Sequence, residues 1–407
     1  MRSGAADRRR SNPLPPWTHP LAFRLYLGAV FLLPVQLEIE SVKALVDSRL
    51  PPGDLLLALS VLLAPASVRI TRSAVGQLPL LLPVVLAYGV IVALTLQGGV
   101  SAHATNIKFL GSVVLVIYAI TTIAYARAGY AATIARTFLL GVTIWGVVGY
   151  IDWRYADILP WLDPDIESRF GALMFDPNNA GALFGVALML CALYGRRLFV
   201  HRATWFGLTL VLAFALTETL SRSAFLAVGA AALTVLIVHQ VSAERWMRIL
   251  AGGVIAVAVL IASGTVDSAV DDFTRRPDTV SSRNEFVDIA VDRWVDSRGL
   301  GMGLGTFRAE NERIVHNTAV WLVVEMSLPG LVFFLAMAAV PFQACLRLRH
   351  HDLQLAIALI GAHTTMVVAS AGIEALYQRS WWIIIGITAL PTVAEEVRPR
   401  TAPVRQR

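Results

Sequence analysis

The sequence predicts an all-α membrane protein that crosses the bilayer about twelve times. Of its 407 residues, 56% are hydrophobic and only 15% are charged, whereas a soluble protein of this length has roughly a quarter charged residues. Apolar runs of about 17 residues or more recur along the whole chain, and such runs are long enough to span a bilayer as helices. The net charge of +6 is distributed between these runs, so we expect it to set membrane topology and not to bind nucleic acid.

The apolar runs define a single transmembrane domain, residues 21–396, between two short tails, 1–20 and 397–407. The first tail contains three consecutive arginines and no small-residue cleavage site, so we expect a retained first helix and not a signal peptide. The expected spans are about 21–36, 52–68, 76–97, 107–125, 131–152, 174–194, 203–220, 222–240, 247–265, 318–345, 353–371 and 380–396.

The arginines between the spans predict which side of the membrane each connection faces. If the N-terminal tail is cytoplasmic, every inside connection is basic, as the positive-inside rule requires. An even number of spans then places the C-terminal tail in the cytoplasm as well. The arginines concerned are Arg69, Arg72, Arg127, Arg196, Arg197, Arg202, Arg245, Arg248, Arg347 and Arg349, with four more in the C-terminal tail.

The longest connection on the expected outer side, about 266–317, has helical character of its own. Ser282 followed by Glu285 is a capping-box pattern, and the apolar residues after it repeat at helical spacing until Gly299, which is a stop signal. We expect an amphipathic helix over 283–298 that lies on the membrane surface. The glycine-rich run 299–305 lacks the G-x-G-x-x-G spacing of a dinucleotide site, so we expect a close-packed or mobile turn there.

Four arginines on the outer side are not explained by topology: Arg169, Arg222, Arg283 and Arg379. A guanidinium near the positive end of a helix dipole is unfavourable by about 0.3–1 kcal/mol, unless an anion lies between the two. Helix N-terminal amides and guanidinium groups are both good phosphate ligands. The alternative is that these arginines reach lipid head groups or pair with Glu218, Asp176 or Glu285.

Residues that begin helices stand close to these arginines in the sequence. Ser221 is a good N-cap directly before Arg222. The run Asp176-Pro177-Asn178 opens another span with proline in its first turn, and Asn317 is expected to cap the span that follows His316. Under the predicted topology, all three helix N-termini face outward.

The phosphate expected at an outer membrane face belongs to a lipid carrier such as a polyprenyl-pyrophosphate-linked sugar. A hydroxyl that attacks the anomeric carbon of this sugar needs a base, and the imidazole of His316 titrates near neutral pH. The alternative is that His316 has no catalytic role and is only a polar residue that flanks a membrane helix. Glu325 lies roughly 13 Å further along that helix, too far to pair with His316 unless Ser327, Pro329 and Gly330 bend it; a carboxylate within a span is itself a functional candidate.

Three stretches of the chain resemble the O-antigen ligase and O-antigen polymerase superfamily in their motifs, order and expected side. The motifs are Asp-Pro-Asn, Ser-Arg-Ser, a Gly-Leu-Gly run and His-Asn. The stretches are SRFGALMFDPNNAGALF (168–184), LTETLSRSAFLAVGAAAL (216–233) and the three parts SSRNEFVDIAVDRW, GLGMGLGTF and VHNTAVWLVVEMSLPG of 281–330. The resemblance covers about 168–330, and the helices outside it match only in hydropathy.

The resemblance implies an inverting, metal-independent glycosyltransferase with a GT-C-like fold in a bacterial inner membrane. It would move a glycan from undecaprenyl pyrophosphate to a lipid or glycan acceptor on the periplasmic side, without a cofactor. His316 would be the base, and Arg222 and Arg283 would bind the pyrophosphate, with Arg169 and Arg379 as further ligands in a looser pattern. The expected supporting residues are Asn317, Ser221, Asp176, Asn178, Glu218 and Glu325. The motifs do not separate ligases, polymerases and protein-glycosylating relatives.

Two alternatives from other classes remain open. A metal-dependent GT-C enzyme would hold a divalent cation with Glu38 and Glu40, or with Asp163 and Asp165, and would be sensitive to a chelator. A transporter or lipid flippase also uses many spans and buried charges, but usually shows inverted repeats, which we do not find in the sequence.

Overall fold

The computed structural model describes residues 20–36, 51–63, 102–156, 170–174, 176–239, 278–311 and 315–389, which form helices and connecting segments without a strand. The α-helices are α1 (Pro20–Phe31), α3 (Pro52–Leu63), α6 (Ala102–Tyr125), α7 (Ala131–Ile151), α8 (Pro177–Leu198), α9 (Arg202–Glu218), α10 (Arg222–His239), α13 (Asp278–Asp296), α14 (Thr306–Asn311), α15 (Thr318–Leu348), α16 (Leu353–Ala369) and α17 (Arg379–Thr388). This part of the chain is therefore all-α, as the sequence predicts.

Within the described residues, four helical stretches are long and apolar enough to cross a membrane, and they suggest a membrane protein. They are Lys108–Tyr155, Pro177–Leu198, Arg222–His239 and Thr318–Leu348. The first contains most of α6 and all of α7, which are joined by a π-helical turn around Gly129, where φ is +92°. Two expected spans, 76–97 and 247–265, lie outside the described residues, as does the end of the expected span 52–68. Helix α1 is shorter than expected, with 12 residues.

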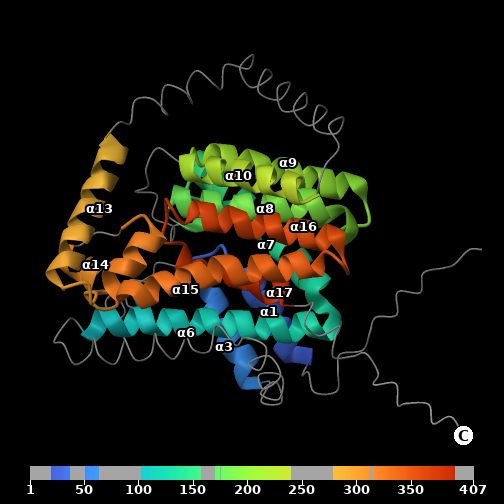
Figure 1. Ribbon diagram of the computed structural model, residues 1–407. Coiled ribbons are helices and arrows are strands. Elements are labelled where there is room, and N and C mark those ends of the chain that lie inside the picture. Colours follow the sequence, from blue (N-terminus) through green and yellow to red (C-terminus); the bar gives the residue numbers. More distant parts are fainter. Residues whose placement is uncertain are drawn as a thin grey trace, which may run out of the picture.

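The long helices lie side by side, and α16 is at their centre (Figure 1). It packs against α8, α10, α15 and α17, and most of its side chains are buried. His363 in the middle of α16 accepts a hydrogen bond at Nδ1 from Trp381 Nε1 (3.0 Å), and its Nε2 lies 2.9 Å from the carbonyl oxygen of Ala338. Because Nδ1 is the acceptor, Nε2 carries the proton, and this histidine links α15, α16 and α17.

The two ends of the bundle differ in chemistry. The connection between α8 and α9 and the connection between α15 and α16 lie together at one end, where Arg197 bonds both carboxylate oxygens of Asp352 at 2.9 and 3.0 Å. Arg196, Arg202 and Arg347 lie in the helix ends beside these connections, and Arg349 follows α15 directly. The N-termini of α8, α10, α15 and α17 belong to the opposite end, so the arginine-rich turns and the expected site are separated by the length of the helices.

The surface helix α13 crosses the bundle end near the start of α15 (Figure 1). It begins at Asp278 and ends at Asp296, so the prediction of a helix is confirmed, but the predicted start and the capping box at Ser282 are wrong. No glycine or proline occurs between 278 and 282, and the helix extends through the capping sequence. The predicted stop is confirmed in a modified form: Arg298 (φ +56°) and Gly299 (φ +72°) are both left-handed, and their N–H groups bond Val295 and Trp294 in a Schellman motif.

Candidate functional site

Asp176 and Ser221 start α8 and α10, and their caps bring two distant motifs together. Asp176 Oδ1 accepts hydrogen bonds from the N–H groups of Asn178 (2.7 Å) and Asn179 (3.2 Å), with Pro177 in the first turn. The buried Ser221 Oγ accepts from the N–H of Ala224 (3.4 Å). Both predicted caps are therefore confirmed.

The same serine joins the two helix starts directly. Ser221 Oγ donates to Asn178 Oδ1 at 3.0 Å and lies 3.2 Å from Ser223 Oγ. A Cβ atom at Gly181 would lie only 2.9 Å from the Cβ of Ser221, so the close approach of α8 and α10 requires glycine there. Arg222, half-buried, is the first residue of α10 and stands directly beside this junction in the chain.

The start of α15 is fixed by a third cap and by the segment that follows α16. Asn317 Oδ1 accepts from the N–H of Val320 at 3.1 Å, which confirms the predicted cap. The N–H of Thr318 donates to the carbonyl of Ser370 (2.8 Å), and its hydroxyl donates to the carbonyl of Ile373 (2.7 Å). His316, half-buried, directly precedes this cap, so the chain is held in place immediately after it.

The segment 370–375 also reaches the start of α10. A Cβ at Gly372 would lie 2.7 Å from Ser223 Cβ, so this segment contacts the Ser-Arg-Ser motif on one side and Thr318 on the other. Asn178, Ser221–Ser223 and His316–Thr318 are far apart in the sequence but belong to one connected end of the bundle. The N-termini of α8 and α10 meet there directly, and the segment 370–375 links them to the N-terminus of α15.

Arg379 has a different environment. Its Nε and Nη2 donate to the two carboxylate oxygens of Asp54 in α3, at 2.6 and 2.5 Å. The side chains are only 20% and 16% exposed, so this is a largely buried bidentate ion pair. One edge of the Arg379 guanidinium therefore binds Asp54 within the fold, so Arg379 is not included among the proposed pyrophosphate ligands.

Other predicted residues are placed less fully. Glu218 is the last residue of α9, and its carbonyl accepts from the N–H of Phe170 at 3.4 Å. Arg283 lies within α13, one turn after its start, so it is not at the helix N-terminus as predicted, and its side chain is outside the description. The positions of Arg169, Glu38, Glu40, Asp163 and Asp165 also lie outside the described residues.

Lys108 is a buried charge at this end that the sequence analysis did not single out. Its ammonium group forms an ion pair with Glu374, with exposed fractions of 12% and 15%, and lies 4.4 Å from the ring centre of Tyr377 and 5.1 Å from that of Trp321. This arrangement ties α6 to the segment 370–378 and to α15. The sequence did contain a signal for this residue, because Lys108 stands at the expected outer end of a span, where the positive-inside rule disfavours a lysine.

Helix α15 is broken close to its start. Ser327 has φ +56° and ψ −146°, which confirms the predicted break or kink. A Cβ at Gly330 would lie 2.2 Å from the carbonyl oxygen of Leu322, so the two parts of the helix press against each other. Residues 318–326 therefore form a short helix of their own, and a broken helix within a span is tolerated where protein surrounds it.

The glycine-rich run 299–305 packs against this break and is a close-packed turn. The N–H groups of Met302 and Gly303 donate to the carbonyls of Val324 and Glu325, both at 2.9 Å. The buried carboxylate of Glu325 accepts from the N–H groups of Gly305 (2.8 Å) and Phe307 (3.3 Å). We call residues 299–307 the glycine clasp.

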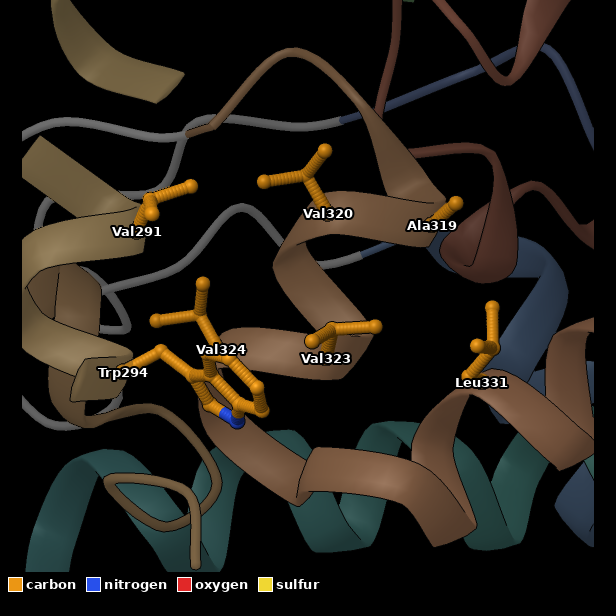
Figure 2. A pocket seen from close by; sticks show the side chains of 7 residues that line it. All are labelled: Val291, Trp294, Ala319, Val320, Val323, Val324 and Leu331. Atoms are coloured by element: carbon orange, nitrogen blue, oxygen red, sulfur yellow. The ribbon is translucent and has the colours of Figure 1, made fainter. Parts of the chain in front are cut away.

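An apolar pocket of about 280 Å³ opens between α13 and the short helix (Figure 2). Its lining is aliphatic and aromatic, with the indole nitrogen of Trp294 as the one polar side-chain atom of the residues that line it: Val291, Trp294, Ala319, Val320, Val323, Val324 and Leu331. The pocket starts only three residues after His316 in the sequence. An apolar chain and a polar group can therefore lie next to each other at this end of the molecule.

The described residues contain no group of three or more His, Cys, Asp or Glu side chains that could hold a metal ion. Neither the family models nor the curated protein sequences compared with this chain give a match. The functional interpretation therefore depends on the residues themselves: a half-buried imidazole, a half-buried guanidinium and three helix N-termini, all at one end of an apolar bundle.

Proposed function

We propose that this protein is a membrane glycosyltransferase that transfers a glycan from a polyprenyl pyrophosphate carrier to an acceptor hydroxyl, with inversion and without a metal ion. The site would face the periplasm of a bacterial inner membrane, and both termini would be cytoplasmic. The full fold would have about twelve spans in a GT-C-like arrangement. The acceptor is a lipid or a glycan, which corresponds to a ligase or a polymerase.

The observation that carries the proposal is the convergence of the Asp-Pro-Asn, Ser-Arg-Ser and His-Asn motifs at one end of the bundle. Each motif starts a helix, so each adds the positive end of a helix dipole. Together with the Arg222 guanidinium, these N-termini favour a phosphate group. The pocket beside α13 supports the same interpretation, because an isoprenoid or acyl chain suits a lining of aliphatic and aromatic side chains.

In the proposed reaction, an imidazole nitrogen of His316 takes the proton of the acceptor hydroxyl. The acceptor oxygen forms a bond to the anomeric carbon as the bond from that carbon to the pyrophosphate oxygen breaks. The bonding electrons leave with the pyrophosphate, whose developing charge Arg222 stabilises. Attack opposite the leaving group inverts the anomeric centre. Asn317 acts through the helix cap that orients the backbone at His316.

The test is glycan transfer in a host that lacks its own enzyme, comparing wild type with His316→Ala at equal membrane expression. His351→Ala is the matched control, because His351 is exposed at the arginine-rich end. We expect no product from His316→Ala and normal product from the control. A ladder of products indicates a polymerase, and a single capped species indicates a ligase. Full activity of His316→Ala would refute the proposed base.

The broken helix in α15 favours a second candidate function. Transporters commonly place a substrate at the point where a spanning helix is interrupted, and Ser327 interrupts α15. The two functions differ in their need for a membrane. If purified protein in detergent transfers the glycan from a lipid-linked donor, the glycosyltransferase is supported. If the donor instead crosses the membrane of sealed vesicles and keeps its glycan, the transporter is supported.

A further inference from the structure

The break in α15 leaves backbone carbonyl groups that the helix itself cannot satisfy. In an unbroken helix, the carbonyl of Glu325 would accept from the N–H of residue 329, but residue 329 is proline and has no N–H. The N–H of Gly303 donates to this carbonyl instead, and that of Met302 donates to Val324. A buried carbonyl without a donor is costly, so the glycine clasp compensates for the break.

Only glycine allows this contact. Gly301 has φ +85°, and a Cβ there would lie 2.8 Å from the carbonyl oxygen of Glu325. Gly303 and Gly305 are also left-handed, with φ +94° and +81°. At the far side of the clasp, Ser327 Oγ donates to the carbonyl of Gly299. The clasp therefore lies directly on the backbone of the broken helix.

The carboxylate of Glu325 completes the arrangement. It is 1% exposed, and its two oxygens accept from the N–H groups of Gly305 and Phe307. The charged groups that interact electrostatically with Glu325 are Lys108 and Glu374. Two hydrogen bonds that one buried side chain accepts from successive parts of the same turn fasten the end of the clasp to α15.

The position of His316 gives this contact a consequence for the site. Gly305 and Glu325 are 20 residues apart, and His316 lies between them in the chain. The hydrogen bonds close that stretch of chain into a ring, whose other fixed points are the Asn317 cap and the bond from Thr318 to Ser370.

We propose that Glu325 is a positioning residue: its carboxylate, through the glycine clasp, fixes the chain on both sides of His316. The link to catalysis rests on the proposed function, but the fixing of the chain does not. Glu325 does not touch the reacting atoms in this account. It acts by closing the ring that contains His316.

Hydrogen exchange of the full-length protein tests the structural part. Glu325→Gln keeps the shape of the side chain but replaces one acceptor oxygen with an NH₂ group, which then faces a backbone N–H. We expect peptides that cover 300–311 and 315–320 to exchange about tenfold faster or more, the factor that corresponds to about 1.4 kcal/mol. Asp352→Asn is the matched control, a carboxylate-to-amide change in the more exposed pair with Arg197 at the arginine-rich end, where the remaining amide oxygen can still cap α16.

The control should leave exchange of both peptides unchanged. Unchanged exchange in Glu325→Gln would refute the proposal, and so would equal acceleration in the control, because the effect would then be general destabilisation. Glu325→Gln combined with Gly301→Ala should accelerate exchange little more than either change alone, since both release the same clasp. Additive effects would also count against it.

The transfer assay separates this inference from the proposed function. We expect Glu325→Gln to lower kcat and to leave KM for the lipid-linked donor nearly unchanged, because the donor-binding groups are not part of the ring. Wild-type kcat in a variant whose clasp exchanges freely would refute the positioning role. Absence of transfer by the wild type itself would refute the proposed function, and the exchange result would still decide whether the clasp fixes the chain.

Discussion

The ion pair between Arg379 and Asp54 provides a quantitative test of which arginines support the fold. Both side chains are largely buried, with exposed fractions of 20% and 16%, and two hydrogen bonds join them. Removing one partner of a buried pair leaves the other charge uncompensated, at a cost of roughly 3–5 kcal/mol. Because both groups retain some exposure, we expect about 3 kcal/mol for Arg379→Ala and for Asp54→Ala.

The double variant removes both charges, so it should cost clearly less than the sum of the single variants. We expect a coupling free energy of about 2 kcal/mol or more, measured by reversible unfolding in mixed micelles. The chain offers a matched control in Arg197 and Asp352, which form an ion pair at the other end with exposed fractions of 53% and 29%. For Arg197→Ala with Asp352→Ser, which retains a capping hydroxyl, we expect a coupling of about 0.2–1 kcal/mol.

A coupling no larger than that of the control pair would refute the argument from burial. The Arg379 guanidinium would then be available for other partners, and Arg379 would return to the proposed donor-binding group. The transfer assay gives an independent check. If Arg379 supports only the fold, the loss of transfer in Arg379→Ala should follow the loss of folded protein, whereas Arg222→Ala should lose transfer while it remains folded.

Three further outcomes are expected. Gly301→Ala should destabilise the protein by at least about 1–2 kcal/mol, because Gly301 has a left-handed φ and the new Cβ would lie against the Glu325 carbonyl. Gly207 lies in open space within α9, so Gly207→Ala should stabilise the protein by about 0.5–1 kcal/mol. Thermal unfolding measures both changes. Asp176→Ala should cost about 0.5–2 kcal/mol through the lost cap, and Asp176→Asn much less. Arg222→Lys should reduce initial transfer rates nearly as far as Arg222→Ala, and EDTA should leave wild-type rates unchanged; sensitivity to EDTA would instead favour the metal-dependent alternative.

The local features of the fold were predictable from the sequence because they depend on neighbouring residues. Helix starts at Asp176, Ser221 and Asn317 follow from side chains that satisfy free backbone N–H groups. The break at Ser327 was predicted from proline and glycine near it. The start of α13 was not predicted correctly, since a capping sequence marks the start of a helix only if the residues before it disfavour helix.

The candidate site was predictable in its components but not in its contacts. The residue types at 176–178, 221–223 and 316–317 indicated helix starts on the expected outer side. The contacts that join these starts, from Ser221 to Asn178 and from residues 370–375 to Ser223 and Thr318, depend on packing between distant helices. Arg222 and Arg379 look alike in the sequence, because each begins an apolar helix. Only the structure places Asp54 of α3 against Arg379.

The sequence by itself determined that the chain is apolar and that its described part is all-α. It also determined where most of the described helices begin and end, and which polar residues interrupt the apolar runs. These properties follow from hydrophobic periodicity and capping, which act over a few residues. The tertiary structure alone decided which charges are paired within the fold, that the glycine run is a clasp on the broken α15, and that Glu325 holds it. Those contacts join residues many turns apart, and the free energy that selects them comes from burying backbone and charged groups that no local pattern records.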